Sequence, residues 1–152
     1  MTNDLTHAAT EGLVRHLEVL HKSVGEIAGP LSEEEFWAKP LQPGNSVGHL
    51  VLHLTGNLKH RVGALLGGTG YVRDRDREFN ETNLPATAEA LAGLDEAVGI
   101  FRQVVEPLSG ERMRSPYPEG LYPTVFDGLI GLVAHFALHR GQISYIARLA
   151  KR

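Results

Sequence analysis

Two histidines four residues apart lie in an apolar segment near the end of the chain, VAHFALHRGQI at residues 133–143. His135 and His139 would lie on one face of a helix, about one turn apart. Neutral imidazoles in this relation can bind one metal ion and leave coordination positions for a third ligand and for water. Phe136 stands where the zincin motif needs a glutamate as general base, so that motif is excluded. The alternative is a pair of histidines with polar partners inside a helical protein.

A third histidine could complete such a site from the helix that apolar repeats predict between residue 45 or 46 and about residue 66. The core stripe of this helix consists of Val47, Leu50, Val51, Leu54, Leu58, Val62 and Leu65. His53 lies on the flank of the stripe beside Asn57, so it can face the interior while it keeps a polar edge. His49 and His60 lie further round the helix, and we expect His49 to be exposed rather than bonded to the ligands.

Composition sets outer bounds on the function. The chain has 152 residues, 42% of them hydrophobic and 22% charged, which is typical of one soluble globular domain, residues 1–152. A formal net charge of −3 gives no basic surface for nucleic acid. Cysteine is absent, which excludes disulfides, thiolate ligands and a cysteine nucleophile. No signal peptide and no apolar run of membrane-spanning length is evident, so we expect no membrane partner and a cytoplasmic protein.

Apolar periodicity predicts four long helices and no strand, which indicates an all-α fold, a four-helix bundle. We expect these helices over residues 4 or 7 to about 28, 46–66, 87–107 and 125–149. Ser32 and Glu35 form a capping box, which predicts a short helical turn between the first two. The fourth helix is apolar nearly all round, as is typical of a buried helix, and it carries His135 and His139.

Two long connections join these helices, at about residues 67–86 and 109–123. Charges of alternating sign from Arg73 to Glu78 predict a solvated loop or an ordered ion-pair network. A connection of about 20 residues is long for a compact domain, so the first should carry function or a crossover. A long crossover between helices 2 and 3 permits an up-down-down-up arrangement. In that arrangement His53 and His139 lie at levels that agree to about one turn, so a three-histidine site is geometrically possible.

The chain resembles the DinB-like superfamily, which includes the YfiT-like proteins assigned as metal-dependent hydrolases and bacterial thiol transferases. The likeness rests on NSVGHLVLHL at residues 45–54, on HFALHRGQ at residues 135–142, and on the order and length of the four helices. The resemblance implies an up-down-down-up bundle that is usually a homodimer. It also implies a divalent metal ion, nickel or zinc in different members, held by His53, His135 and His139.

The resemblance also suggests a reaction, because some relatives use a low-molecular-weight thiol as cosubstrate and the metal lowers its pKa. Three imidazoles leave an open position where such a thiol can bind, or where water can ionise near neutral pH. The helix faces near the histidines offer Asn57, Gln142 and His49 as candidate catalytic groups, and no carboxylate. The lack of a general base favours activation of a thiol over hydrolysis. We therefore expect a thiol S-transferase or a hydrolase that acts on a small electrophilic substrate.

The competing interpretation is a non-enzymatic, stress-related dimer with a structural or sensing metal. The openness of the site distinguishes the two. A catalytic ion should face a pocket lined by side chains of the two long connections. A structural ion should be enclosed by a fourth protein ligand, for which His49 is the nearest candidate.

Overall fold

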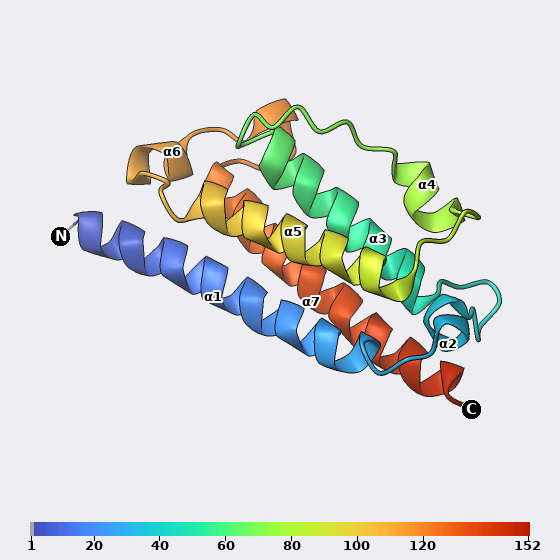
Figure 1. The fold of residues 1–152 in the computed structure, drawn as a ribbon. Helices are drawn as coiled ribbons and strands as arrows, with labels where there is room; N and C mark the ends of the chain where they lie inside the picture. The colour runs from blue at the N-terminus through green and yellow to red at the C-terminus, as the bar shows by residue number, and fades with distance from the viewer. Residues whose placement is uncertain (1) are drawn as a thin grey trace.

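The structure, a computed structural model, describes residues 2–152 (for Thr2 and Asn3 the backbone alone), and these residues form helices and loops without a strand. Long helices lie side by side (Figure 1): α1 (Thr2–Ala28), α3 (Val47–Leu58) with its π-helical continuation η1 (Lys59–Ala64), α5 (Thr87–Val105) and α7 (Val125–Ala150). Short helices lie between them: α2 (Glu33–Trp37), α4 (Arg75–Asn80), α6 (Gly110–Arg114) and the 3₁₀ turn η2 (Pro118–Gly120). The prediction of an all-α fold is confirmed.

Local capping fixes where several helices begin. The Ser46 hydroxyl accepts a hydrogen bond from the backbone N–H of His49 at the start of α3, and Thr124 caps α7 in the same way. Ser32 and Glu35 form the predicted capping box at α2. These caps set the register of α3 and α7, the two helices that carry the histidine motifs.

A single apolar core joins the long helices. α1 packs against α5 and α7, and α3 packs against the same two helices. Large side chains without solvent exposure fill the space between them, including Leu17, Leu54, Phe101, Leu129 and Phe136. This packing holds α3 and α7 beside each other along the line where their histidines lie.

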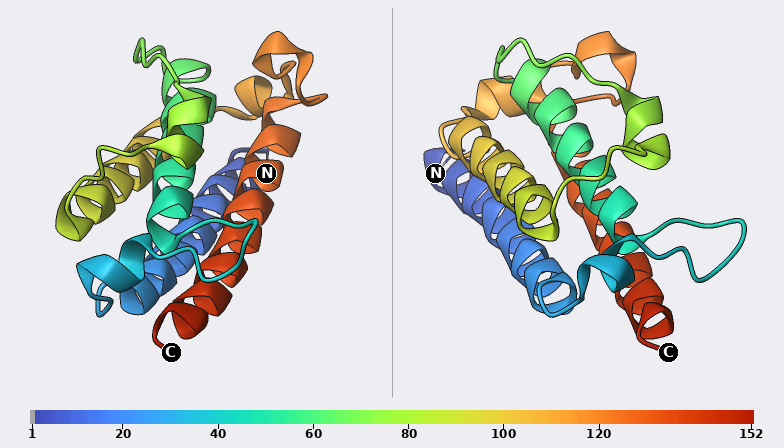
Figure 2. Two further views of the ribbon diagram at one scale, coloured as in Figure 1. Left: turned by 90° about the vertical axis from the view of Figure 1, so that its right-hand side faces the viewer. Right: turned by 45° about the vertical axis from the view of Figure 1, so that its right-hand side comes forward.

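The connection between η1 and α5 crosses over α3 and is not simply a solvated loop. It carries α4, which packs against α3. Both views in Figure 2 place α4 on the side of α3 turned away from α1. Glu78 of α4 is buried, with 6% of its surface exposed. Of the two interpretations of the charged segment from Arg73 to Glu78, the ordered ion-pair network agrees better with the structure.

The expectation that α7 is buried all round was wrong. Its face with Phe126, Ile130, Leu138 and Tyr145 is exposed, and 60% of the Leu138 surface reaches solvent. Periodicity reports how apolar a face is and not what covers it. Among the described residues no single helix is long and apolar enough to cross a membrane; α7 passes that test only as a pair with residues 110–120, across a bend of 72°.

Candidate metal centre

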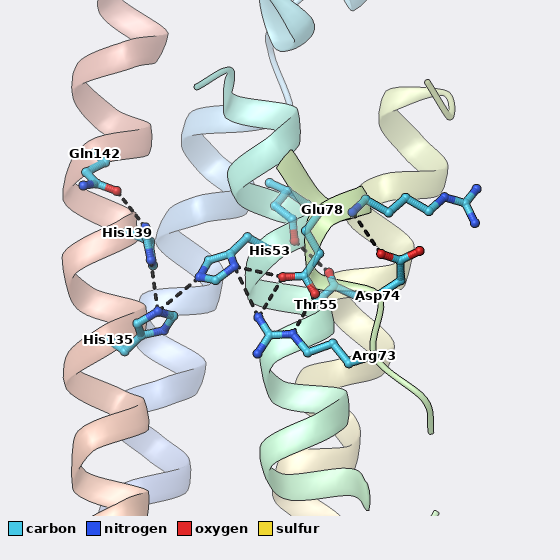
Figure 3. Close-up of polar contacts among 10 residues, drawn as sticks. His53, Thr55, Arg73, Asp74, Glu78, His135, His139 and Gln142 are labelled. Atoms are coloured by element: carbon cyan, nitrogen blue, oxygen red, sulfur yellow. Dashed lines mark hydrogen bonds and ion pairs between the residues drawn. The ribbon is translucent and has the colours of Figure 1, made fainter. Parts of the chain in front are cut away.

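His53 of α3 and His135 and His139 of α7 point toward one another (Figure 3). The Nε2 atom of His135 lies 3.2 Å from Nε2 of His53 and 3.0 Å from Nε2 of His139. Each residue offers one ligand atom, and these atoms all lie within 4.8 Å of one another. The three histidines therefore form a group that could hold a metal ion.

Hydrogen bonds on the far side of two of the rings orient them. The Nδ1 of His53 lies 2.9 Å from Oε1 of Glu78, and the Nδ1 of His139 lies 2.7 Å from Oε1 of Gln142. A carboxylate and an amide oxygen only accept, so both rings carry their proton on Nδ1 and turn an Nε2 lone pair toward His135. The Nδ1 of His135 is buried and has no partner among the described residues.

This donor set fits a divalent ion. With its proton on Nε2, His135 can donate to only one of its two neighbours, and the lone pair of the other neighbour is left without a donor. With its proton on Nδ1, both contacts bring lone pairs together at about 3 Å. A cation among the three atoms would accept all three lone pairs and so resolve either case. Nitrogen ligands 2.0–2.1 Å from a tetrahedral ion are separated by roughly 3.3–3.4 Å, close to the separations found here. Imidazole ligands suit zinc and nickel alike.

Burial keeps the rings on α7 neutral. Desolvation lowers the pKa of His135 to about 4, and the positive charges that His139 and His53 would carry act in the same direction. Desolvation also lowers the pKa of His139, although its hydrogen bond to Gln142 partly offsets that effect. A metal ion binds the neutral form of imidazole, so His135 and His139 are already in their metal-binding form in the folded chain.

A buried ion pair supports His53. Arg73 donates from Nε to Oε2 of Glu78 at 2.8 Å and from Nη2 to Oε1 at 2.7 Å. Burial raises the pKa of Glu78, but the hydrogen bonds from Arg73 and His53 together lower it below its usual value. Gly56 makes room for this carboxylate, because a Cβ there would lie 2.1 Å from Oε2 of Glu78. Ala or any larger residue at position 56 would displace Glu78.

Sequence reasoning found no carboxylate on the helix faces near the histidines, and it missed Glu78, which reaches His53 from α4. Glu78 comes from the crossover, 25 positions beyond His53, so no helical spacing relates the two. The only signal was indirect. The alternating charges from Arg73 onward had an ordered ion-pair network as one interpretation, and Glu78 is the member of that segment that is buried.

The structure corrects the position of His49 and separates it from the three-histidine group. His49 is buried, with 4% of its surface exposed, where we expected exposure. Its Nδ1 lies 2.6 Å from the Ser46 hydroxyl and its Nε2 lies 3.1 Å from the carbonyl oxygen of Glu81. Desolvation lowers its pKa, and the bond to Glu81 only partly opposes this. With both nitrogens engaged, His49 ties the crossover to the start of α3.

The other two candidate catalytic groups, Gln142 and Asn57, lie in different surroundings. Gln142 is exposed, and its side-chain oxygen accepts from His139, so it orients a ring of the histidine group. Asn57 lies one turn beyond His53 on α3, and 8% of its surface is exposed. Its side chain has no hydrogen-bond partner among the described residues and lines the pocket in front of the histidines.

That pocket has a volume of about 290 Å³. It is lined by His53, Asn57, Arg61, Arg73, Arg75, Phe79, Tyr122, Leu132, His135 and His139. Both long connections contribute, the first through Arg73, Arg75 and Phe79 and the second through Tyr122. A larger hollow of about 660 Å³ lies between α3, the crossover and the start of α5, but no histidine lines it.

The family described as "Protein of unknown function (DUF1572)" matches residues 7–152, nearly the whole chain. No curated protein matches the chain.

Proposed function

The chain belongs to this DUF1572 family, and we propose that it is a metal-dependent enzyme with nickel or zinc held by His53, His135 and His139. One substrate would be a low-molecular-weight thiol, or water in its place. The other would be a small electrophile to which the thiol or the water is added. The observation that carries this proposal is the placement of three imidazole nitrogens on the wall of a pocket. A site built only for structure would be closed by the protein.

Openness of the site supports the catalytic reading over the structural one. The histidine group has three members among the described residues, and His49, the nearest candidate for a fourth ligand, is bonded to Ser46 and Glu81 instead. Side chains of both long connections line the pocket, as we expect of a substrate site.

The chain's own residues position and shield such a site. Glu78 and Gln142 hold two rings with Nε2 turned to the pocket. When bound, a divalent ion with three imidazole ligands supplies the Lewis acidity that lowers the pKa of a neighbouring thiol or water. Phe79, Tyr122 and Leu132 provide apolar walls that exclude bulk water.

The absence of a free base favours the thiol over hydrolysis. Among the described residues no carboxylate lines the pocket. Both oxygens of Glu78 are occupied, by Arg73 and by His53, and its lowered pKa makes it a poor proton acceptor. A thiol is acidic enough to be deprotonated without a dedicated base, whereas attack by water benefits from one.

The fold is consistent with a DinB-like, up-down-down-up bundle, and we include that assignment in the proposal. In Figure 1, α1 and α7 run in one direction while α3 and α5 run in the other. The crossover that carries α4 supplies the long connection that this order requires.

A homodimer is part of the proposal, and the exposed face of α7 supports it. Phe126, Ile130, Leu138 and Tyr145 share this face, and a second copy of the chain would cover it. Light scattering should give about twice the chain mass. Leu138→Asp should give a monomer with unchanged helicity, whereas the control Val19→Asp, on the exposed side of α1, should stay dimeric.

Metal analysis paired with conjugation assays tests the function. The purified protein, its metal-free form and the reconstituted form are offered a small electrophile such as monochlorobimane with several cellular thiols. We expect conjugation that is lost in the metal-free form, returns with nickel or zinc, and depends on which thiol is supplied. Imidazole should inhibit it by competing for the open position.

The structural alternative predicts a different result from the same samples. A structural or sensing metal would raise the melting temperature when bound, and no thiol or hydrolase substrate would be turned over by fully metallated protein. That outcome of a thorough screen would overturn the enzymatic proposal and leave the metal site standing.

A further inference from the structure

The pocket in front of the histidines carries an excess of positive charge. Its charged lining residues are Arg61, Arg73 and Arg75. Arg73 is neutralised by Glu78 through two hydrogen bonds. Arg61 and Arg75 have no carboxylate partner among the described residues, although the Arg75 guanidinium lies 5.4 Å from the centre of the Phe79 ring. Two guanidinium groups are thus available to an anion that enters.

Asn57 adds an independent indication of a ligand. The residue is 8% exposed and lines the pocket, and its side chain has no hydrogen-bond partner among the described residues. Its amide is not one of the fully buried side-chain groups without a partner, so it keeps access to the pocket and is free to hydrogen-bond with what binds there. A bound group with an oxygen acceptor would supply the missing partner for the Asn57 amide.

The backbone places Arg61 in line with these groups. His53, Asn57 and Arg61 follow one another at intervals of four along α3 and η1. At the end of the π-helical segment, the Leu65 N–H donates to the carbonyl of His60 and the Leu66 N–H donates to the carbonyl of Val62. The carbonyl of Arg61 therefore accepts from neither of these backbone N–H groups.

The buried Tyr117 hydroxyl donates to that carbonyl at 2.7 Å and fixes the backbone at Arg61. π-helical turns occur often at functional sites. Here the turn lies at the charged end of the pocket, where a fixed backbone holds the base of the Arg61 side chain.

The rest of the lining defines the body of the ligand. Phe79, Tyr122 and Leu132 give apolar surface beside the histidines. The volume of about 290 Å³ is at the small end of the range for ligand pockets. A guanidinium fork can bind two oxygens of either a carboxylate or a phosphate, and the small volume with a single amide beside the fork favours the smaller and less charged carboxylate.

We infer that this pocket binds a small organic carboxylate, with its charged group on Arg61 and Asn57 and its apolar body against Phe79, Tyr122 and Leu132. Under the proposed function, on which this assignment of a substrate class rests, the electrophile that accepts the thiol is a carboxylic acid of low molecular weight. Arg75 at the rim attracts the anion.

Binding of a non-reactive probe tests the inference separately from catalysis. Benzoate and its neutral analogue benzamide are titrated into the full chain, both metal-free and zinc-loaded, by calorimetry or by NMR. We expect benzoate to bind both forms and benzamide to bind about tenfold or more weakly. Phenyl phosphate should bind more weakly than benzoate, and tighter binding of it would overturn the carboxylate assignment.

Variants assign the charge partner. Arg61→Gln should weaken benzoate binding about tenfold to a hundredfold, and Arg61→Lys should restore part of it, because the lysine keeps the charge without the fork. Arg15→Gln removes the same charge from the exposed side of α1 and should change nothing. Imidazole should bind zinc-loaded Arg61→Gln as tightly as the parent protein, which shows that the metal centre is intact.

Some results would overturn the inference. These are equal binding of benzoate and benzamide, benzoate binding unchanged in Arg61→Gln, or an equal loss in Arg15→Gln. An inactive protein that still binds benzoate through Arg61 would contradict the proposed function alone, whereas an active one indifferent to Arg61 would contradict only the carboxylate site.

Discussion

His53 and His139 turn the same ring atom toward the same point, but the two halves of the site are supported differently. On the α3 half, His53 is buried and donates to Glu78, which is itself buried and held by Arg73. On the α7 half, His139 donates to Gln142, an exposed neighbour on its own helix. One half is a tertiary ion-pair network and the other is a local pair of side chains.

This difference indicates where the site is preorganised. The α3 half has a fixed ring because α3 meets two parts of the crossover there: the loop with Arg73, and α4 with Glu78. The α7 half can reorient at little cost, since an exposed amide is readily replaced by water. Between them, His135 has a buried Nδ1 with no partner among the described residues. We therefore expect metal affinity to depend strongly on Glu78 and weakly on Gln142.

Removing a ligand histidine should cause the largest loss of metal binding, and the loss should be equal for the two halves of the site. His53→Ala, His135→Ala and His139→Ala should each abolish stoichiometric nickel or zinc binding, because three neutral donors are the minimum for a tight site. Calorimetric titration measures this, with His16→Ala as an exposed control. Full affinity in His139→Ala would remove the α7 half from the site.

Removing Glu78 should have the next largest effect and should sharpen the contrast between the halves. Glu78→Ala leaves the buried guanidinium of Arg73 unpaired, which should cost about 3–5 kcal/mol in unfolding free energy. Loss of the acceptor for His53 should also weaken metal binding about tenfold to a hundredfold. Denaturant unfolding and metal titration measure the two effects.

A matched variant separates the charge of Glu78 from its shape. Glu78→Gln keeps an oxygen that can accept from His53 but loses the negative charge. It should fall between the parent protein and Glu78→Ala in both measurements. If Glu78→Ala bound metal as tightly as the parent protein, the preorganisation argument for the α3 half would fail.

The pH dependence of the metal-free protein probes the ring between the two halves. The unfolded chain binds a proton at His135 with the ordinary imidazole pKa near 6.5, whereas burial lowers the folded pKa to about 4. The unfolded state therefore binds more protons between these values, and unfolding free energy should fall as pH drops from about 6.5 toward 4. His139, with its lowered pKa, contributes with the same sign.

Urea unfolding in a chelator at pH 7, 6 and 5 measures this slope. His135→Ala should flatten part of it, and His16→Ala should leave it unchanged. For the metal-loaded protein, binding should persist below pH 6, because the lowered pKa values postpone the competition with protons. Loss of metal already near pH 6.5 would contradict the burial argument.

Local sequence predicted the helices and singled out three histidines that the fold brings together. Caps such as Ser46 and Thr124 act within three residues, and the apolar repeats act within a few turns, so both can be seen in the sequence. The four-residue spacing of His135 and His139 is equally local. These features needed no knowledge of distant contacts.

The features of the site that the sequence did not predict depend on contacts between residues that are distant in the sequence. Glu78 reaches His53 because Gly56 leaves space for it, a relation between two helices that no periodicity encodes. His49 is buried because the crossover passes over it at Glu81. The solvent exposure of Leu138 likewise depends on what packs against α7, and its apolar character alone suggested burial.

The smallest effect should come from Gln142, and it tests the weaker half of the site. Gln142→Ala removes an exposed acceptor whose place water can take, so metal affinity should fall by less than about tenfold and the melting temperature should hardly change. Gln103→Ala, at an exposed glutamine on α5, serves as the control.

Gln142→Glu provides the reverse test, because it gives His139 the kind of partner that His53 has in Glu78. A charge-assisted hydrogen bond is stronger than a neutral one, so this variant should raise metal affinity a few-fold. If Gln142→Ala instead lowered affinity as much as Glu78→Gln does, the two halves would be equally preorganised. If it left metal binding intact but reduced turnover, Gln142 would act on the substrate and not only on the ring of His139.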